Sequence, residues 1–292
     1  MGEPEGYDRQ QALDAYRQWL QPAHWPGHGR RTAEGNAAFF LPHLRPGMTL
    51  LDAGCGVGTI TVGLAEAVAG AGATRRGEAV GIDANEGAIR EARDRAAAQG
   101  VVNVRFEVAD VHSLPFNDAE FDAVFCHGVL EHLTEPVSVV REFRRVLRPG
   151  GVIGVAEADL DTQVVWPRDP LLERSVTLVE RLWAESGGWG YPSGQGSDLR
   201  VGKRLRDFLH EAGFMACVGT ASAACDGSSE STRLAAECEA RYLEAAPLVE
   251  HAVLLGIATR EELRLMADAW RYWGSRPGAF RLKCVCQAVA WA

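Results

Sequence analysis

The sequence lacks several features that would place the protein in other classes. No apolar run approaches the roughly 20 residues that cross a bilayer, and the opening residues Met-Gly-Glu-Pro-Glu hold no signal-peptide core. The seven cysteines are an odd number without paired metal-ligand spacing, which argues against a disulfide framework and a zinc site. We therefore expect a cytoplasmic protein with no membrane contact and no bound metal.

The sequence also has fewer basic than acidic residues. The chain has 30 Lys and Arg against 39 Asp and Glu, which gives a net charge of -9 and a pI of about 5.4. Because such a chain offers no general field to phosphate backbones, nucleic acid is not expected as a partner. With 292 residues, 47% of them apolar, the chain is long enough to bury a core. The sequence leaves open whether it forms a homodimer.

Short β-rich runs alternate with helix-period segments between residues 48 and 157, as in a doubly wound α/β sheet. We expect strands over five ranges there: 48–53, 78–83, 104–110, 121–126 and 151–157. A further alternating run, 282–291, predicts a strand near the C-terminus. The predicted fold is a Rossmann-like, mostly parallel seven-stranded sheet with helical cap insertions.

Three parts are expected along the chain. Residues 1–45 hold two predicted helices, 7–20 and 31–44, that cover the ligand edge of the sheet, and residues 46–160 form the core. Residues 161–292 complete the sheet and carry a substrate cap at about 161–200 and 228–278.

Two segments of the predicted cap have specific signals. Thr259-Arg260-Glu261-Glu262 has capping-box spacing, and it opens a helix with an apolar face made of Leu263, Met266, Trp270 and Trp273. The Gly-rich, aromatic stretch 187–194 could gate the substrate, or it could be a plain surface connection.

The strongest motif is Asp52-Ala53-Gly54-Cys55-Gly56-Val57-Gly58, at the point where the first strand turns into a helix. Glycines at alternate positions permit positive φ and remove Cβ atoms, so that a ligand can lie against bare backbone at a helix N-terminus. A dinucleotide fingerprint would need its third glycine at position 59, which is Thr59. The spacing therefore disfavours NAD.

Carboxylates follow the next two strands. Asp83 ends the second predicted strand, where a ribose diol would lie on the crevice side of the sheet. Asp110-Val111 ends the third and could meet an adenine edge through one carboxylate and one backbone amide. Each acid alone could be a helix cap or a solvated strand end, but their register with the glycine turn favours a nucleoside site.

Four segments carry a family resemblance: LLDAGCGVGTIT, VGIDANEGAIREAR, FEVADVHSLPFNDAEFDAVFCHGVLEHL and REFRRVLRPGGVIGVAE. Residues 48–157 resemble the core of the class I S-adenosylmethionine-dependent methyltransferases, most of all the subgroup of ubiquinone and menaquinone biosynthesis methyltransferases. The resemblance implies that fold and S-adenosylmethionine as cofactor, and it says little about the substrate.

The resemblance also implies roles for individual residues. Asp52 and the Gly54, Gly56 and Gly58 turn would hold the methionine part of the cofactor. Asp83 would take both ribose hydroxyls, with Ala84 packing on the adenine, while Asp110 would accept from the adenine amino group and Val111 would present its amide. The carbonyl of Cys126 or His127 would meet the methionine ammonium.

Other polar residues are open to two interpretations. His127 is the best candidate for a general base, although it could only shape the pocket. Glu157, Asp159 and Asp161 could anchor a cationic substrate or lie in a solvated loop, and we favour the loop. His28, Arg30 and Arg31 could close over the cofactor's carboxylate or lie on the surface.

The expected function is methylation of a small molecule on oxygen, nitrogen or carbon, in specialised or quinone-like metabolism. The alternative is a protein that binds S-adenosylmethionine for a non-methylating reaction or a regulatory role. Tight cofactor binding without a methylated product would favour that alternative.

Overall fold

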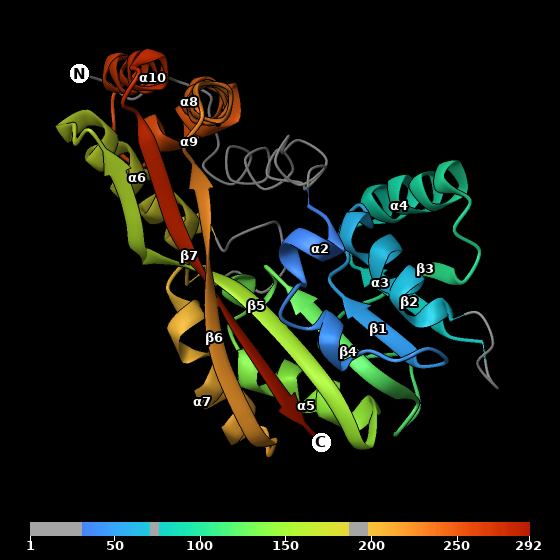
Figure 1. Cartoon of the computed structure of the whole chain (residues 1–292). Coiled ribbons are helices and arrows are strands. Elements are labelled where there is room, and N and C mark those ends of the chain that lie inside the picture. Colours follow the sequence, from blue (N-terminus) through green and yellow to red (C-terminus); the bar gives the residue numbers. More distant parts are fainter. Residues whose placement is uncertain (1–30, 71–75, 187–197) are drawn as a thin grey trace. The chain divides into compact units, whose positions relative to one another are not determined.

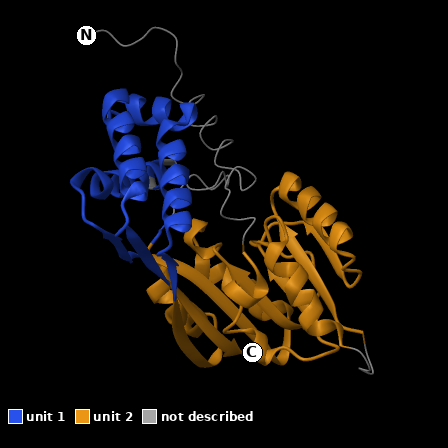
Figure 2. Ribbon diagram, turned by 45° about the horizontal axis from the view of Figure 1, so that its top comes forward, with its two compact units in different colours: residues 1–21, 160–199, 223–284 blue, residues 22–159, 200–222, 285–292 orange. Residues whose placement is uncertain are grey.

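The computed structural model describes residues 31–70, 76–186 and 198–292, and the chain divides into two compact units (Figure 2). Unit 1 comprises residues 1–21, 160–199 and 223–284, and unit 2 comprises residues 22–159, 200–222 and 285–292. The predicted helix 7–20, His28, Arg30 and the loop 187–194 lie outside the described residues.

Seven strands form one sheet in the order β3-β2-β1-β4-β5-β7-β6 (Figure 1). Their bounds are β1 Thr49–Ala53, β2 Glu78–Asp83, β3 Val104–Val108, β4 Phe121–His127, β5 Leu147–Trp166, β6 Met215–Asp226 and β7 Phe280–Trp291. Strands β3, β2, β1, β4 and β5 pair in parallel. The end of β7 meets the start of β5, where Gly150 N donates to Ala292 O at 2.9 Å, so these two strands are antiparallel. The predicted mostly parallel, Rossmann-like sheet is confirmed.

Three strands end at a different residue from the one predicted. β3 stops two residues before Asp110, and β4 includes His127. β5 does not end at Glu157 but continues to Trp166, because beyond the parallel core it still has β7 beside it. At that level Cys284 N donates to the Thr162 hydroxyl at 2.8 Å. The additional length of β5 is thus set by a partner that is distant in sequence.

Alternate residues of the central strands enter different apolar clusters, because successive side chains of a strand point to opposite faces. On one face, Leu50 and Ala123 cluster with α3, and on the other, Leu51 and Val124 cluster with α5. The helices of unit 2 are α2 Ala33–Asn36, α3 Thr59–Ala69, α4 Glu86–Gln99, α5 Pro136–Val146 and α7 Leu205–Glu211. The sheet is therefore covered on both faces, as its apolar strands require.

The predicted helix over 31–44 is wrong. The structure has the short helix α2, capped by the Thr32 side chain, and a separate 3-10 turn, η3, at Leu41–His43. Pro42 in that turn has no amide hydrogen, so it cannot continue an α-helical ladder through this point. The segment is still anchored, because Phe40 is fully buried with its ring centroid 5.5 Å from that of Phe125.

The described part of unit 1 contains four α-helices: α6 Pro170–Ser186, α8 Ser229–Glu244, α9 Ala246–Leu254 and α10 Arg260–Ser275. α10 has the predicted capping box, formed by Thr259 and Glu262, and its predicted apolar face is buried. Trp270 and Trp273 meet edge to face, with ring centroids 5.4 Å apart. Within the described ranges, every helix is too short or too polar to cross a membrane.

Candidate active site

The glycine turn joins β1 to α3 and carries three left-handed backbone positions. Gly54, Gly56 and Gly58 have φ values of 77°, 52° and 74°. A Cβ at Gly54 would lie 2.2 Å from Val129 Cγ2, and one at Gly58 would lie 2.8 Å from Ala92 Cβ. At Gly56, by contrast, nothing lies within 4 Å of the Cβ position. Packing thus explains two of the glycines, while the third leaves an open, bare stretch of backbone against which a ligand can lie.

Asp52 lies at the carboxyl end of β1 and is only 3% exposed. Its Oδ2 accepts a hydrogen bond from the Thr61 hydroxyl of α3 at 2.6 Å. Burial raises the pKa of Asp52 to about 7; the Thr61 hydrogen bond opposes this rise, and the charge of Asp83 adds to it. A nearby cation would favour the ionised carboxylate, so the site is suited to a ligand with positive charge.

Asp83 ends β2 and ties that strand to the glycine turn. Its Oδ2 accepts from Gly56 N at 3.0 Å, and its Oδ1 accepts from Asn85 N at 2.8 Å. Burial raises the pKa of Asp83 even though these two amides stabilise its charge. Ala84, which follows, is exposed, as a residue that packs on an adenine ring would be before the ring binds. The structure therefore brings the motif and the second acid together.

Asp110 and Val111 lie just beyond β3. The Asp110 side chain is 61% exposed and its Oδ1 lies 2.7 Å from His112 Nδ1. Although partial burial opposes it, hydrogen bonds from the His112 amide and ring hold the pKa of Asp110 below its usual value. Val111 is buried in the sheet's apolar cluster. Asp110 is thus an ionised, accessible acceptor held in place by Val111.

His127 ends β4 on the same sheet edge. Its Nε2 lies 3.4 Å from the side-chain nitrogen of Asn36 in α2, and its ring packs against Phe125. An amide nitrogen is only a donor, so a neutral His127 accepts through Nε2 and carries its proton on Nδ1. To act as a base through Nε2, the ring would have to release Asn36.

Glu157 and Asp159 are not in a solvated loop, so that interpretation is wrong for both. They lie within β5 and are 0% and 1% exposed. Glu157 Oε1 accepts from Val129 N at 2.9 Å and from Leu130 N at 2.7 Å, while Asp159 Oδ2 accepts from Lys203 N at 3.1 Å. Asp161, two residues further along, is exposed. The acidic run after the predicted strand gave no sign of this burial, because β7 extends the strand.

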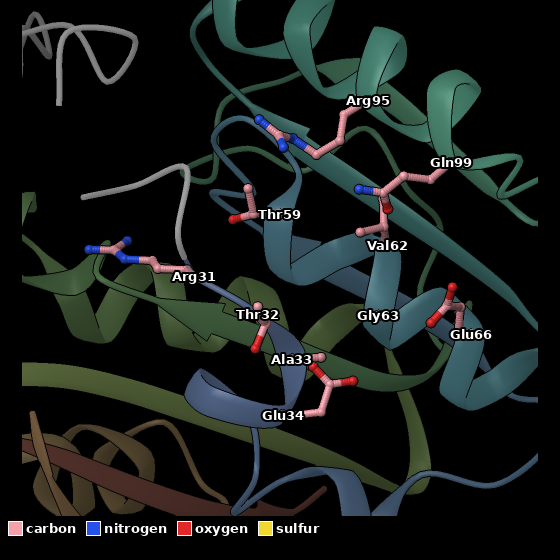
Figure 3. Close-up of a pocket in the computed structure, with 10 residues that line it drawn as sticks. All are labelled: Arg31, Thr32, Ala33, Glu34, Thr59, Val62, Gly63, Glu66, Arg95 and Gln99. Atoms are coloured by element: carbon pink, nitrogen blue, oxygen red, sulfur yellow. The ribbon is translucent and has the colours of Figure 1, made fainter. Parts of the chain in front are cut away.

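Arg31 precedes α2 and lines a pocket of about 240 Å³ that is also lined by α3 and α4 (Figure 3). Its guanidinium points away from the other labelled side chains of the pocket. A Cβ at Gly128 would lie 3.6 Å from Arg31 Nη1. Arg31 is therefore not a plain surface residue, since it reaches the turn that follows β4.

The predicted site residues lie at the carboxyl ends of four neighbouring strands. In the order β3-β2-β1-β4, these ends carry Asp110, Asp83, Asp52 and His127. Hydrogen bonds join the glycine turn to Asp83 directly, and Thr61 to Asp52. Sequence reasoning missed Thr61, whose only signal is a hydroxyl on the first turn of the helix that follows the motif.

The chain is similar to known methyltransferases. Residues 44–201 match the model of a methyltransferase domain family. A protein named "Probable methyltransferase ltbC" from Aspergillus luteorubrus is 30% identical over 277 residues, which cover 89% of this chain and 91% of that protein. An uncharacterized methyltransferase of Schizosaccharomyces pombe, C1B3.06c, is 33% identical over 49% of this chain, which spans about half (51%) of its length.

The fold has a counterpart among solved structures. The YcgJ protein from Bacillus subtilis superposes with a TM-score of 0.54 at 21% identity, covering 87% of this chain and 96% of that one. This likeness concerns the fold alone. Taken with the family model, it shows that the chain belongs to the class I S-adenosylmethionine-dependent methyltransferases.

Proposed function

We propose that the protein transfers the methyl group of S-adenosylmethionine to a small molecule, on an oxygen, nitrogen or carbon atom. The observation that supports this most is the link between Gly56 and Asp83, which sets an open backbone turn beside a buried carboxylate. The nucleoside would bind across this pair, with its methionine part over the Gly54 turn and its adenine near Asp110 and Ala84. The relatives named as methyltransferases support the reaction class.

The residues present suit this cofactor. Asp83 offers acceptor oxygens to a ribose diol, because each oxygen accepts one backbone amide and has a second lone pair for a hydroxyl. Asp52 is buried and becomes more acidic when a cation lies close by, which matches a group that carries an ammonium and a sulfonium. Bound S-adenosylmethionine supplies an electrophilic methyl group whose sulfur leaves as a neutral thioether. The protein's own task is therefore to hold the acceptor in line and to exclude water.

His127 is the proposed proton acceptor where the acceptor atom carries a proton. Its place at the end of β4 puts it on the edge where the methyl group would be presented. Asn36 holds the imidazole through Nε2, so the proton would be taken after this contact opens. An acceptor that is already nucleophilic would need no base, and His127 would then only shape the wall of the pocket.

We also propose an assignment for the described part of unit 1. Its helices α6, α8, α9 and α10 are proposed as the substrate cap, and a flat or apolar substrate of specialised or quinone-like metabolism suits the exposed aromatic side chains of that unit, Trp166 and Tyr272. The quinone-like assignment depends on the motif resemblance and not on a site feature.

The test is incubation of the purified protein with methyl-labelled S-adenosylmethionine and a panel of phenols, amines and quinones. We expect label to enter at least one product, and to be lost after Asp83→Ala. Calorimetric binding of S-adenosylhomocysteine without any labelled product from the panel would favour a non-methylating or regulatory role. No binding at all would contradict the assignment.

A further inference from the structure

Glu157 is a carboxylate that the proposed reaction does not use, and it is completely buried in β5. One oxygen, Oε1, accepts two backbone amides, from Val129 at 2.9 Å and from Leu130 at 2.7 Å. Among the described residues, Oε2 has no hydrogen-bond donor. Burying a carboxylate in this way is costly, so the two amides that it holds must matter to the molecule.

The two amides belong to the turn that leaves β4 and enters the 3-10 helix η4, Leu130–His132. This turn begins at Gly128, whose amide donates to Ala156 O of β5 at 2.9 Å. Glu157 therefore fixes the next two amides of the same turn from the same strand. As a result, three successive amides after β4 are all anchored on β5.

The turn fixed in this way forms one wall of the glycine motif. Val129 Cγ2 is the atom that a Cβ at Gly54 would meet at 2.2 Å, so the Val129 side chain packs directly on the bare backbone of Gly54. The contacts run from Glu157 to the Val129 amide and from the Val129 side chain to Gly54. A shift of the turn would move the wall against which the methionine end of the cofactor is proposed to lie.

The electrostatic surroundings explain why this carboxylate is unusual. Burial and the charge of Glu131 raise the pKa of Glu157 well above its ordinary value, while the two amides and the charge of Arg31 act in the opposite direction. Arg31 in turn reaches Gly128 of the same turn. The turn is thus held from the β5 side by a carboxylate and approached by the guanidinium of the segment before α2.

We propose that Glu157 is a positioning residue for the methionine end of the cofactor, acting through the Val129 amide and the Val129–Gly54 contact. This inference rests on the proposed function, since it assumes that the site binds S-adenosylmethionine. Glu157 does not touch the reacting atoms in this scheme. Its removal would leave two buried amides without an acceptor and would let the turn move away from Gly54.

The test compares two ligands by calorimetry, S-adenosylhomocysteine and 5′-methylthioadenosine, which has the same adenosine but no amino-acid part. Glu157→Ala should weaken S-adenosylhomocysteine binding by roughly ten- to hundredfold, as expected when buried amides lose their acceptor. It should change 5′-methylthioadenosine binding by less than about threefold, because the adenosine contacts lie elsewhere. Glu157→Gln keeps an acceptor oxygen and should restore most of the selectivity.

Asp122→Ala is the matched control. Asp122 also accepts a backbone amide, from Thr49 at 2.8 Å, but it lies at the opposite, amino end of β4. Its loss should lower the melting temperature without altering the ratio of the two affinities. Should Glu157→Ala fold poorly, Val129→Ala tests the same contact from the other side and should also weaken S-adenosylhomocysteine selectively.

The outcomes separate this inference from the proposed function. If the wild type binds S-adenosylhomocysteine but Glu157→Ala or Val129→Ala weakens both ligands equally, or neither, the positioning role is wrong. If the wild type binds neither ligand, the proposed function itself fails. A selective loss in both variants, with partial recovery in Glu157→Gln, supports the role.

Discussion

Carboxylates behave differently in the two units. In unit 2, Asp52, Asp83 and Glu157 are buried, and burial raises the pKa of each. In unit 1, hydrogen bonds and charge from Arg271 hold the pKa of Glu237 and Glu244 below the usual value. These acids of unit 1 thus lie where the ionised form is stabilised, while the three buried acids of unit 2 lie where burial disfavours it. Such perturbed groups gather at functional sites, where a ligand offsets their cost.

Packing differs in the same way. The core of unit 1 is built on large rings, and two of its buried indole nitrogens have side-chain acceptors: Trp270 Nε1 donates to Ser175 Oγ at 2.9 Å, and Trp183 Nε1 donates to Tyr242 at 2.5 Å. The site of unit 2 is built instead on glycines and on carboxylates that hold backbone amides. The comparison indicates that unit 1 is optimised for packing and that the sheet edge is optimised for binding. Four measurements test this comparison.

The largest effect is expected from Trp270→Ala. Trp270 is 1% exposed, packs edge to face on Trp273 and donates to Ser175, so its loss leaves a large cavity and a hydroxyl without its partner. We expect the free energy of unfolding to fall by roughly 3–5 kcal/mol in denaturant titrations. Tyr272→Ala, at a side chain that is 65% exposed, is the control. A loss below about 1 kcal/mol for Trp270→Ala would show that unit 1 is not a tightly packed core.

The second-largest effect is expected from Asp83→Ala, and it concerns ligand affinity. We expect the dissociation constant for S-adenosylhomocysteine to rise about hundredfold, which is roughly 3 kcal/mol, because two ribose hydroxyls lose a charged acceptor. Asp83→Asn keeps one acceptor oxygen, so its dissociation constant should lie between those of Asp83→Ala and the wild type. Titration calorimetry measures both, with circular dichroism to check folding. Wild-type affinity in Asp83→Ala would remove the basis of the assignment.

Asp52→Asn should change how stability depends on pH. The folded-state pKa of Asp52 is raised to about 7, so between its unfolded value and 7 the folded state binds the extra proton and the ligand-free protein loses stability as pH rises. Asp52 alone should account for roughly 2 kcal/mol of this loss between pH 5 and pH 7. Denaturant titrations of both proteins at the two pH values should show a smaller decline in the variant. An equal loss of stability in the variant and the wild type would mean that Asp52 ionises as readily in the folded protein as in water.

The smallest effect is expected from Glu261→Gln in α10. Glu261 pairs with Arg264 at 2.6 Å on an exposed helix surface, and that hydrogen bond together with the charge of Arg264 lowers the pKa of Glu261. Because exposed pairs of this kind contribute little, the melting temperature should not change measurably. A clear drop would mean that the surface pairs of unit 1 carry stability after all, and would weaken the contrast with unit 2.

The sheet could be predicted because its signals are local. Residues 79–82 form a continuous apolar run, with Ala79 buried on one face of the sheet and Val80 and Ile82 on the other, and the glycine motif marks the turn into α3 without help from distant residues. The helix α10 could be predicted equally well, because its capping box lies within four consecutive residues and its apolar face repeats with the helical period. The prediction failed at 31–44, where α2 already ends at Asn36 and Pro42 keeps the following turn from joining an α-helical ladder.

The amino-acid sequence by itself determined the alternation of strands and helices over residues 48–157, the bare turn at Gly54 to Gly58 and the acids at the ends of β1 and β2, because periodicity, glycine and strand ends are properties of neighbouring residues. Only the tertiary structure decided that Glu157 is buried and holds the turn after β4, that Thr61 holds Asp52, and that β5 continues to Trp166. These depend on partners far along the chain, and burial and hydrogen-bond pairing exist only once those partners meet.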